Sequence, residues 1–131
     1  MKTEIKIYYN DTDCGGVVYY ANYLKFFEQG RTEYLNAVGL SPKELMAQGI
    51  LFAVVTADVV YHRPARYGDT LVIDTFVTEI FGASVSFGYK VFNKESNQLL
   101  TEGNTKVVLV DTNMKVRKLE PWFREKLSGQ V

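Results

Sequence analysis

The stretch DTDCGGVVYYANY, residues 11–23, combines residue types at a spacing that could do chemistry. Asp13 is followed by two glycines, and a helical pattern begins near Tyr20 and Ala21. A carboxylate can attack a carbonyl or activate water, glycine lets the backbone approach a ligand, and a helix start offers unpaired N–H groups to an oxyanion. This combination indicates acyl transfer. The alternative is that Asp11 and Asp13 only form turns, with their side chains bonded to their own backbone.

Other catalytic chemistries lack their residues in this sequence. His62 is the only histidine and Cys14 the only cysteine, so a Ser-His-Asp or Cys-His arrangement would have to use His62 as its base. A lone histidine is more often a surface or capping residue, and we interpret Cys14 as a small turn residue rather than a nucleophile. A lone cysteine forms no internal disulfide, and with scattered acids it makes no metal site. We therefore expect neither a metal nor an organic cofactor.

The charged residues set limits on the partners. Lysine plus arginine and aspartate plus glutamate number 15 each, so the chain lacks the basic surface that general nucleic-acid binding needs. A local cationic patch for a small anion remains compatible with this balance. Arg63 and Arg66 flank Pro64 in a predicted turn, and they could present guanidinium groups to a phosphate. Taken singly, each is more typical of a solvated surface.

Length and composition predict one domain over residues 1–131, large enough to bury its own core. The opening MKTEIKIYYN lacks a signal-peptide core, and no apolar run approaches the length of a membrane span. We therefore expect a cytoplasmic protein without membrane insertion. The hydrophobic content of 47% and aromatic content of 14% are high for a small domain. Contacts beyond the core of the monomer would explain this excess, so we expect a homo-oligomer.

Hydrophobic periodicity indicates the elements that must position the acid loop. Strands are expected at residues 4–9, 51–61, 70–80, 84–92 and 99–110, and helices at residues 21–37, 42–48 and 121–127. The long helix should bury a stripe formed by Tyr23, Phe26, Phe27, Gly30, Tyr34 and Ala37. A glycine on this face favours a close approach to another backbone or to a sheet. Short loops should join the last four strands into an antiparallel meander, against which the long helix packs in an α+β fold.

A family resemblance enters at YYNDTDCGGVVYYANYLKFFEQGRTEYL, residues 8–35. This stretch resembles the opening of the hotdog-fold acyl-CoA thioesterases, specifically the 4-hydroxybenzoyl-CoA thioesterase family and its Tol-Pal-associated, YbgC-like branch. The later YHRPARYGDTL, residues 61–71, is similar to a turn of that family. The resemblance implies a hotdog fold, in which an antiparallel sheet wraps a long helix, and hydrolysis of acyl-CoA thioesters to free acid and CoA.

The resemblance also implies roles for individual residues. Asp13 takes the position of the catalytic carboxylate, as base or nucleophile, and Tyr20 the position whose backbone N–H binds the thioester carbonyl. Sites of this family lie at the interface of a dimer joined edge to edge, and tetramers are common. The substrate-binding residues that we predict are Tyr9, Gly16, Val18, Tyr20, Arg63 and Arg66.

One position departs from the YbgC-like pattern. That branch usually has a histidine seven residues after the aspartate, where this chain has Tyr20, as in the hydroxybenzoyl branch. The difference favours an aromatic acyl group and argues against a histidine-assisted mechanism. Two alternatives remain open. An acyl-thioester dehydratase would need a catalytic histidine near the start of the long helix, from which we expect His62 to be distant, and a non-catalytic module would only bind acyl-CoA or a partner protein.

Overall fold

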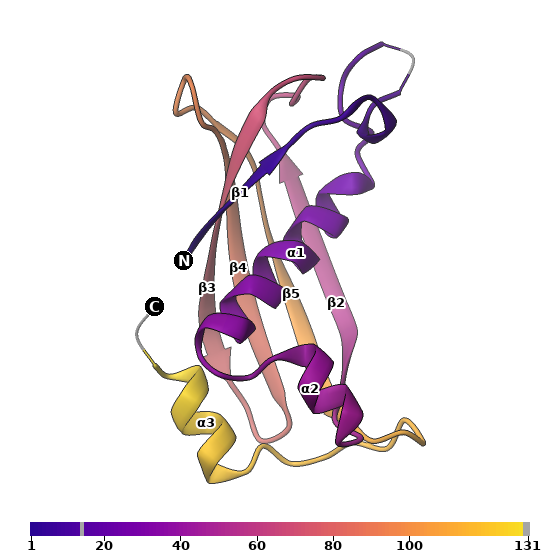
Figure 1. Cartoon of the computed structure of the whole chain (residues 1–131), viewed down its shortest axis with the longest axis vertical. Helices are drawn as coiled ribbons and strands as arrows, with labels where there is room; N and C mark the ends of the chain where they lie inside the picture. The colour runs from indigo at the N-terminus through magenta and orange to yellow at the C-terminus, as the bar shows by residue number, and fades with distance from the viewer. Residues whose placement is uncertain (14, 130–131) are drawn as a thin grey trace.

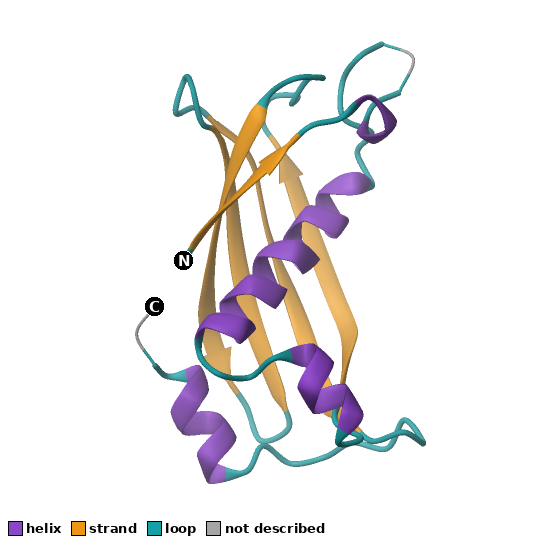
Figure 2. Cartoon of the chain, in the orientation of Figure 1, coloured by secondary structure: helices purple, strands orange, loops and turns teal. Residues whose placement is uncertain are grey.

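The computed structural model describes residues 1–13 and 15–129, and it places their strands in one antiparallel sheet (Figure 1). The strands follow the order β1-β3-β4-β5-β2. They are β1 (Lys2–Lys6), β2 (Leu51–Tyr61), β3 (Thr70–Ile80), β4 (Ser84–Asn93) and β5 (Leu99–Val110). The helices are α1 (Asn22–Ala37), α2 (Pro42–Ala47) and α3 (Pro121–Leu127), with a short 3-10 turn η1 (Tyr9–Asp11). The predicted α+β class is confirmed, and α1 lies across one face of the sheet (Figure 2).

The long helix α1 buries most of its predicted stripe. Tyr23, Phe26, Phe27, Gly30 and Tyr34 are buried, and the ring of Phe27 stacks on that of Tyr89 in β4 with centroids 4.4 Å apart. Ala37 is exposed, contrary to the prediction, because the buried face shifts at the end of the helix. The residues that are buried there instead are Arg31 and Leu35.

Gly30 marks the close approach that its position predicts. A Cβ at Gly30 would overlap the Thr75 hydroxyl and come within 3.0 Å of Ile73, both in β3. The helix therefore lies on the sheet at a distance that no larger side chain permits, and this contact fixes the position of α1 over β3.

The first strand, β1, ends earlier than the alternating pattern predicts. It ends at Lys6, and Tyr9 lies in η1 with 69% of its surface exposed, so the prediction of a strand to residue 9 is wrong. The cause is Asp11, whose Oδ2 accepts the Tyr8 N–H at 2.9 Å while its own N–H donates to the Tyr8 carbonyl at 3.0 Å. These two bonds close a tight turn in place of further strand pairing.

The expected four-strand meander is also wrong, because β2 does not pair with β3. Only β3, β4 and β5 follow one another as neighbours, while β2 pairs antiparallel with β5 from Leu51↔Val110 to Tyr61↔Thr101. The segment after β2 crosses the end of the sheet, with the N–H groups of His62 and Arg63 both donating to the Leu100 carbonyl. The crossing segment carries the chain past β5 and β4 and leaves β2 at an edge.

That edge is long and apolar. The centre of β2 is exposed, with 51% of Val54 and 53% of Val55 accessible. The opposite edge is the five-residue β1. No helix in the described ranges, 1–13 and 15–129, has the length and hydropathy to cross a membrane.

Candidate active site

The acid loop folds into a small hairpin immediately before α1. Thr12 and Val18 form an antiparallel bridge, and the Asp13 N–H donates to the Val17 carbonyl at 3.0 Å. The Gly16 N–H returns to the Asp13 carbonyl at 3.1 Å, and Gly16 has a φ of +76°, a conformation that favours glycine. Cys14, interpreted from the sequence as a turn residue, lies outside the described residues.

The two acids of the loop have different environments. Asp13 is exposed, and its Oδ1 accepts the Gly15 N–H at 2.8 Å. Asp11 is buried, and its Oδ1 accepts the Lys25 ammonium at 2.7 Å. Burial favours a raised pKa for Asp11, but the bonds from Lys25 and from the Tyr8 N–H outweigh it, so its pKa is lowered. Asp11 therefore holds the loop to α1 as a carboxylate, and Asp13 is the acid that a substrate can reach.

The start of α1 leaves backbone donors free. Its N-cap residue, Ala21, makes no side-chain capping bond. Within the part of the chain that the structure describes, neither the Tyr20 N–H nor the Ala21 N–H has an acceptor. The Tyr20 carbonyl, in contrast, accepts the Tyr61 hydroxyl at 3.0 Å and the Tyr23 N–H at 3.4 Å. These bonds hold the backbone of the first turn and leave the Tyr20 and Ala21 N–H groups available for a ligand with negative charge.

The segment after β2 supports the acid loop from the other side. The Val18 N–H donates to the Ala65 carbonyl at 2.8 Å, and the Tyr67 N–H donates to the Gly16 carbonyl at 3.0 Å. The backbone of Arg66 pairs with Val17. The loop and this segment thus form a small two-stranded unit at one end of the molecule.

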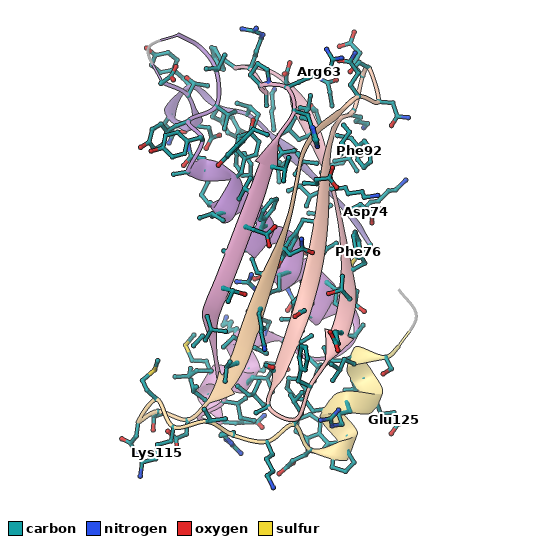
Figure 3. All side chains as sticks on the ribbon, turned by 180° about the vertical axis from the view of Figure 1, so that it is seen from behind. Arg63, Asp74, Phe76, Phe92, Lys115 and Glu125 are labelled. Carbon is teal, nitrogen blue, oxygen red and sulfur yellow. The ribbon has the colours of Figure 1, made fainter. Side chains whose placement is uncertain are left out.

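A cavity of about 260 Å³ opens beside the helix start. It is lined by Val18, Tyr20, Tyr23, Tyr61, His62, Arg63 and Pro64. Arg63 lies at the same end of the sheet as the acid loop, as the view from behind shows (Figure 3). Tyr9 lies nearby, its ring edge to face with Tyr67 at 5.8 Å. The fold therefore brings all the predicted site residues to one end of the molecule, around the loop and this cavity.

His62 is closer to the helix start than the sequence analysis expected. It lines the same cavity as Tyr20, so the expectation that it is distant from the long helix is wrong. Its Nε2 lies 2.8 Å from Glu102 Oε2, an exposed pair that holds the ring at the end of the sheet. Among the described residues, no group of three histidine, cysteine or acidic side chains is placed to hold a metal.

The sequence analysis did not single out two residues, Tyr61 and Arg31, whose contacts the structure shows. Tyr61 bonds the helix start through its hydroxyl, although its place at the end of a predicted strand gave no signal of that contact. Arg31 is buried on the sheet-facing side of α1, and a signal for this did exist: it lies four residues after Phe27 and four before Leu35.

The fold and the acid loop at the helix start define the class of this protein. The family model described as Thioesterase superfamily matches residues 15–100, beginning two residues after Asp13. The chain belongs to this superfamily, and the expectation of a thioesterase of the hotdog fold is confirmed.

Particular relatives narrow the class. The chain is similar to the acyl-CoA thioester hydrolase YbgC of Escherichia coli, 44% identical over 116 residues that cover 88% of this chain and 86% of that protein. Among solved structures it is similar to the DHNA-CoA thioesterase of Staphylococcus aureus, with a TM-score of 0.89 and 30% identity over 95% of this chain and 83% of that one. A 4-hydroxybenzoyl-CoA thioesterase mutant in complex with 4-hydroxybenzoyl-CoA shares the fold, with a TM-score of 0.89, 20% identity and 98% of both chains covered. The predicted branch is confirmed by the first of these relatives.

Proposed function

We propose that this protein hydrolyses acyl-CoA thioesters, with Asp13 as the catalytic carboxylate and the free N–H groups at the start of α1 as the oxyanion site. The observation that carries the proposal is an exposed carboxylate in the acid loop together with unbonded backbone donors of Tyr20 and Ala21 at the helix start that follows it. The activity itself agrees with the name of the Escherichia coli relative.

The chemistry follows from this arrangement. The thioester carbonyl oxygen accepts the N–H groups at the helix start, where the positive end of the helix dipole stabilises the charge that develops on it. Asp13 either attacks the carbonyl carbon, giving an anhydride that water then cleaves, or removes a proton from the attacking water. The C–S bond breaks, the thiolate of CoA takes up a proton, and the acid is released. Neither route needs a metal or an organic cofactor.

The surroundings of the loop suit the CoA moiety of the substrate. Arg63 lines the cavity beside Tyr20, and Arg66 lies in the segment that pairs with the acid loop. Both guanidinium groups are available to the phosphates of CoA. Tyr9 and Tyr67 present exposed rings nearby, on which an adenine base can stack. Because the chain has no net charge, its overall field does not attract the nucleotide, and a local cationic patch has to bind it.

A dimer joined along β2 completes this proposal. The edge of β2 is long, apolar and exposed at its centre, and such an edge invites pairing with another strand. A two-fold axis through the centre of β2 pairs the strand with its own copy, antiparallel, and joins two sheets into one. If the axis passes near Thr56, the middle of the exposed stretch, Tyr61 of the partner subunit lies opposite Leu51. Association of two such dimers into a tetramer stays a prediction, as does the cytoplasmic location.

Release of free CoA thiol tests the proposal directly. The wild type and Asp13→Asn are compared on acetyl, hexanoyl, palmitoyl, glutaryl and benzoyl thioesters of CoA. Asp13→Asn should lower kcat at least about 100-fold, the usual contribution of a catalytic acid or base. Asp111→Asn is the matched control, because Asp111 Oδ1 accepts the Asn113 N–H at 2.8 Å in a turn of the same kind. Turnover by Asp13→Asn at more than half the wild-type rate would contradict the assignment, and no turnover of any thioester by the wild type would favour the non-catalytic module.

A further inference from the structure

A second cavity, of about 370 Å³, lies between α1, α2 and the start of β2. Its walls are mostly apolar, with Leu35, Met46, Ile50, Phe52 and Val110 among the lining side chains. Its size is within the range of small-molecule sites. The lining also includes one buried cation, Arg31, which the mechanism proposed above does not use, and one exposed carboxylate, Glu28.

Arg31 makes no ion pair with a described carboxylate. Only 9% of its surface is exposed, and its Nη1 donates to the Tyr89 hydroxyl at 3.1 Å and to the Thr105 hydroxyl at 3.4 Å. Among the described residues, no carboxylate lies within 4.0 Å of its guanidinium nitrogens. Glu28, one turn earlier, instead accepts the Thr32 hydroxyl at 2.9 Å.

The partners of Arg31 are neutral. The Tyr89 and Thr105 hydroxyls lie 2.6 Å apart and bond each other as well as the guanidinium. Burial raises the pKa of Tyr89, so its phenol stays protonated at neutral pH and supplies no negative charge. A buried cation that no carboxylate contacts is costly, and the remaining N–H groups of the guanidinium are donors suited to a negatively charged oxygen. The cavity thus has mostly apolar walls, with Arg31 as its buried cation and the exposed Glu28 as its one carboxylate.

In the proposed β2 dimer, with its axis near Thr56, this cavity would face the acid loop of the partner subunit. Antiparallel pairing about the centre of β2 would bring the end of the partner strand, with the partner's Tyr61, alongside Leu51, which lines the cavity. Tyr61 contacts the helix start within its own chain. An acyl group whose carbonyl is bound at the helix start of one subunit can therefore extend into the Arg31 cavity of the other.

We propose that Arg31 is a specificity-determining residue, and that its cavity selects acyl groups with a negatively charged oxygen at their far end, as in the CoA thioester of a dicarboxylic acid. This inference rests on the proposed function and on the β2 dimer. The apolar walls contact the methylene groups of such a chain, and the fork of donors on the guanidinium matches a terminal carboxylate. A methyl-ended chain of the same length leaves the cation unpaired in a filled cavity, which the site penalises.

The test compares glutaryl-CoA with pentanoyl-CoA, two five-carbon acyl groups that differ in their far end. The wild type should show a kcat/KM at least about 10-fold higher for glutaryl-CoA. Arg31→Met, a neutral side chain of similar length, should lose most of this preference, chiefly through a higher KM for glutaryl-CoA. Lys43→Met, which removes an exposed cation of α2, should leave the ratio of the two substrates unchanged. A ratio of substrates does not depend on the amount of folded enzyme.

The outcomes separate this inference from the proposed function. Equal hydrolysis of both thioesters by the wild type, or an Arg31→Met enzyme with an unchanged ratio, would overturn the role of Arg31 and leave the thioesterase intact. Failure of the wild type to cleave any acyl-CoA would instead overturn the proposed function. If Arg31→Met does not fold, Arg31→Lys supplies the second variant. It keeps the charge without the fork, so it should retain part of the preference, and full retention of the wild-type ratio would contradict recognition by the fork.

Discussion

Replacing Asp11 by asparagine should weaken the fold and spare the chemistry, the opposite of what is expected of Asp13 two residues later. An asparagine at this position can still accept the Tyr8 N–H, but its NH₂ group faces the Lys25 ammonium in place of the oxygen now 2.7 Å away. The substitution therefore removes a charge-assisted bond of a buried carboxylate. We expect the free energy of unfolding to fall by about 2 kcal/mol. The loss is not larger because Lys25 is half-exposed, so solvent screens its charge.

The effect of Asp11→Asn on the free energy of unfolding should also depend on pH. The pKa of Asp11 is lowered in the folded chain from its ordinary value of 3.8. A lowered pKa stabilises the folded chain above the pKa of the unfolded state, and the contribution is lost as the pH falls through the folded-state pKa. The difference between the wild type and Asp11→Asn should thus be full near neutral pH and shrink progressively below about pH 4.

Urea unfolding followed by far-UV circular dichroism measures the loss in free energy and its dependence on pH, and thermal unfolding measures the midpoint temperature. Near neutral pH the midpoint temperature should fall by about 7 °C for a chain of this size. Asp13→Asn is the control, because an exposed turn residue that keeps its oxygen for the Gly15 N–H should change stability by less than about 0.5 kcal/mol. The reasoning would be refuted if Asp11→Asn unfolded like the wild type near neutral pH, or if the difference stayed constant into acid.

Three further predictions concern the site, the helix and the assembly. Tyr20→Phe should change kcat less than about 3-fold, because the role proposed for Tyr20 is its backbone N–H; a 100-fold loss, about 2.7 kcal/mol, would assign the hydroxyl a direct part instead. Gly30→Ala should lower the thermal midpoint despite the better helix propensity of alanine, since the added Cβ overlaps the Thr75 hydroxyl and overpacking costs about 1 to 3 kcal/mol; an unchanged or higher midpoint would show that α1 can move away from β3. Sedimentation equilibrium should give a dimer of about twice the 14.9 kDa chain, or a tetramer. Val55→Lys, at the exposed centre of β2, should shift the protein toward monomer and abolish its thioesterase activity. A wild-type monomer that is active would refute the shared site.

The sequence by itself determined the elements and the acid loop. The helical spacing of apolar residues from Tyr23 to Tyr34 predicts α1 and most of its buried face, and Gly30 within that stripe predicts the close approach to the sheet. The order Asp13, glycines, helix start indicates an acyl-transfer site, and the same stretch carries the resemblance to the thioesterase family. These features are local, so neighbouring residues suffice to specify them.

Only the tertiary structure decided the order of the strands and the contents of the cavities. A sequence pattern shows that β2 is a strand but not whether it pairs with β3 or β5, because pairing is a contact between residues far apart in the chain. That choice leaves β2 at an edge and brings His62 and Tyr61 to the start of α1. Periodicity likewise places Arg31 on the helix without showing its partners, since Tyr89 and Thr105 reach it from two other strands. The helical spacing can place Arg31 on the buried face, but the partners that accept its N–H groups are a property of the assembled layers.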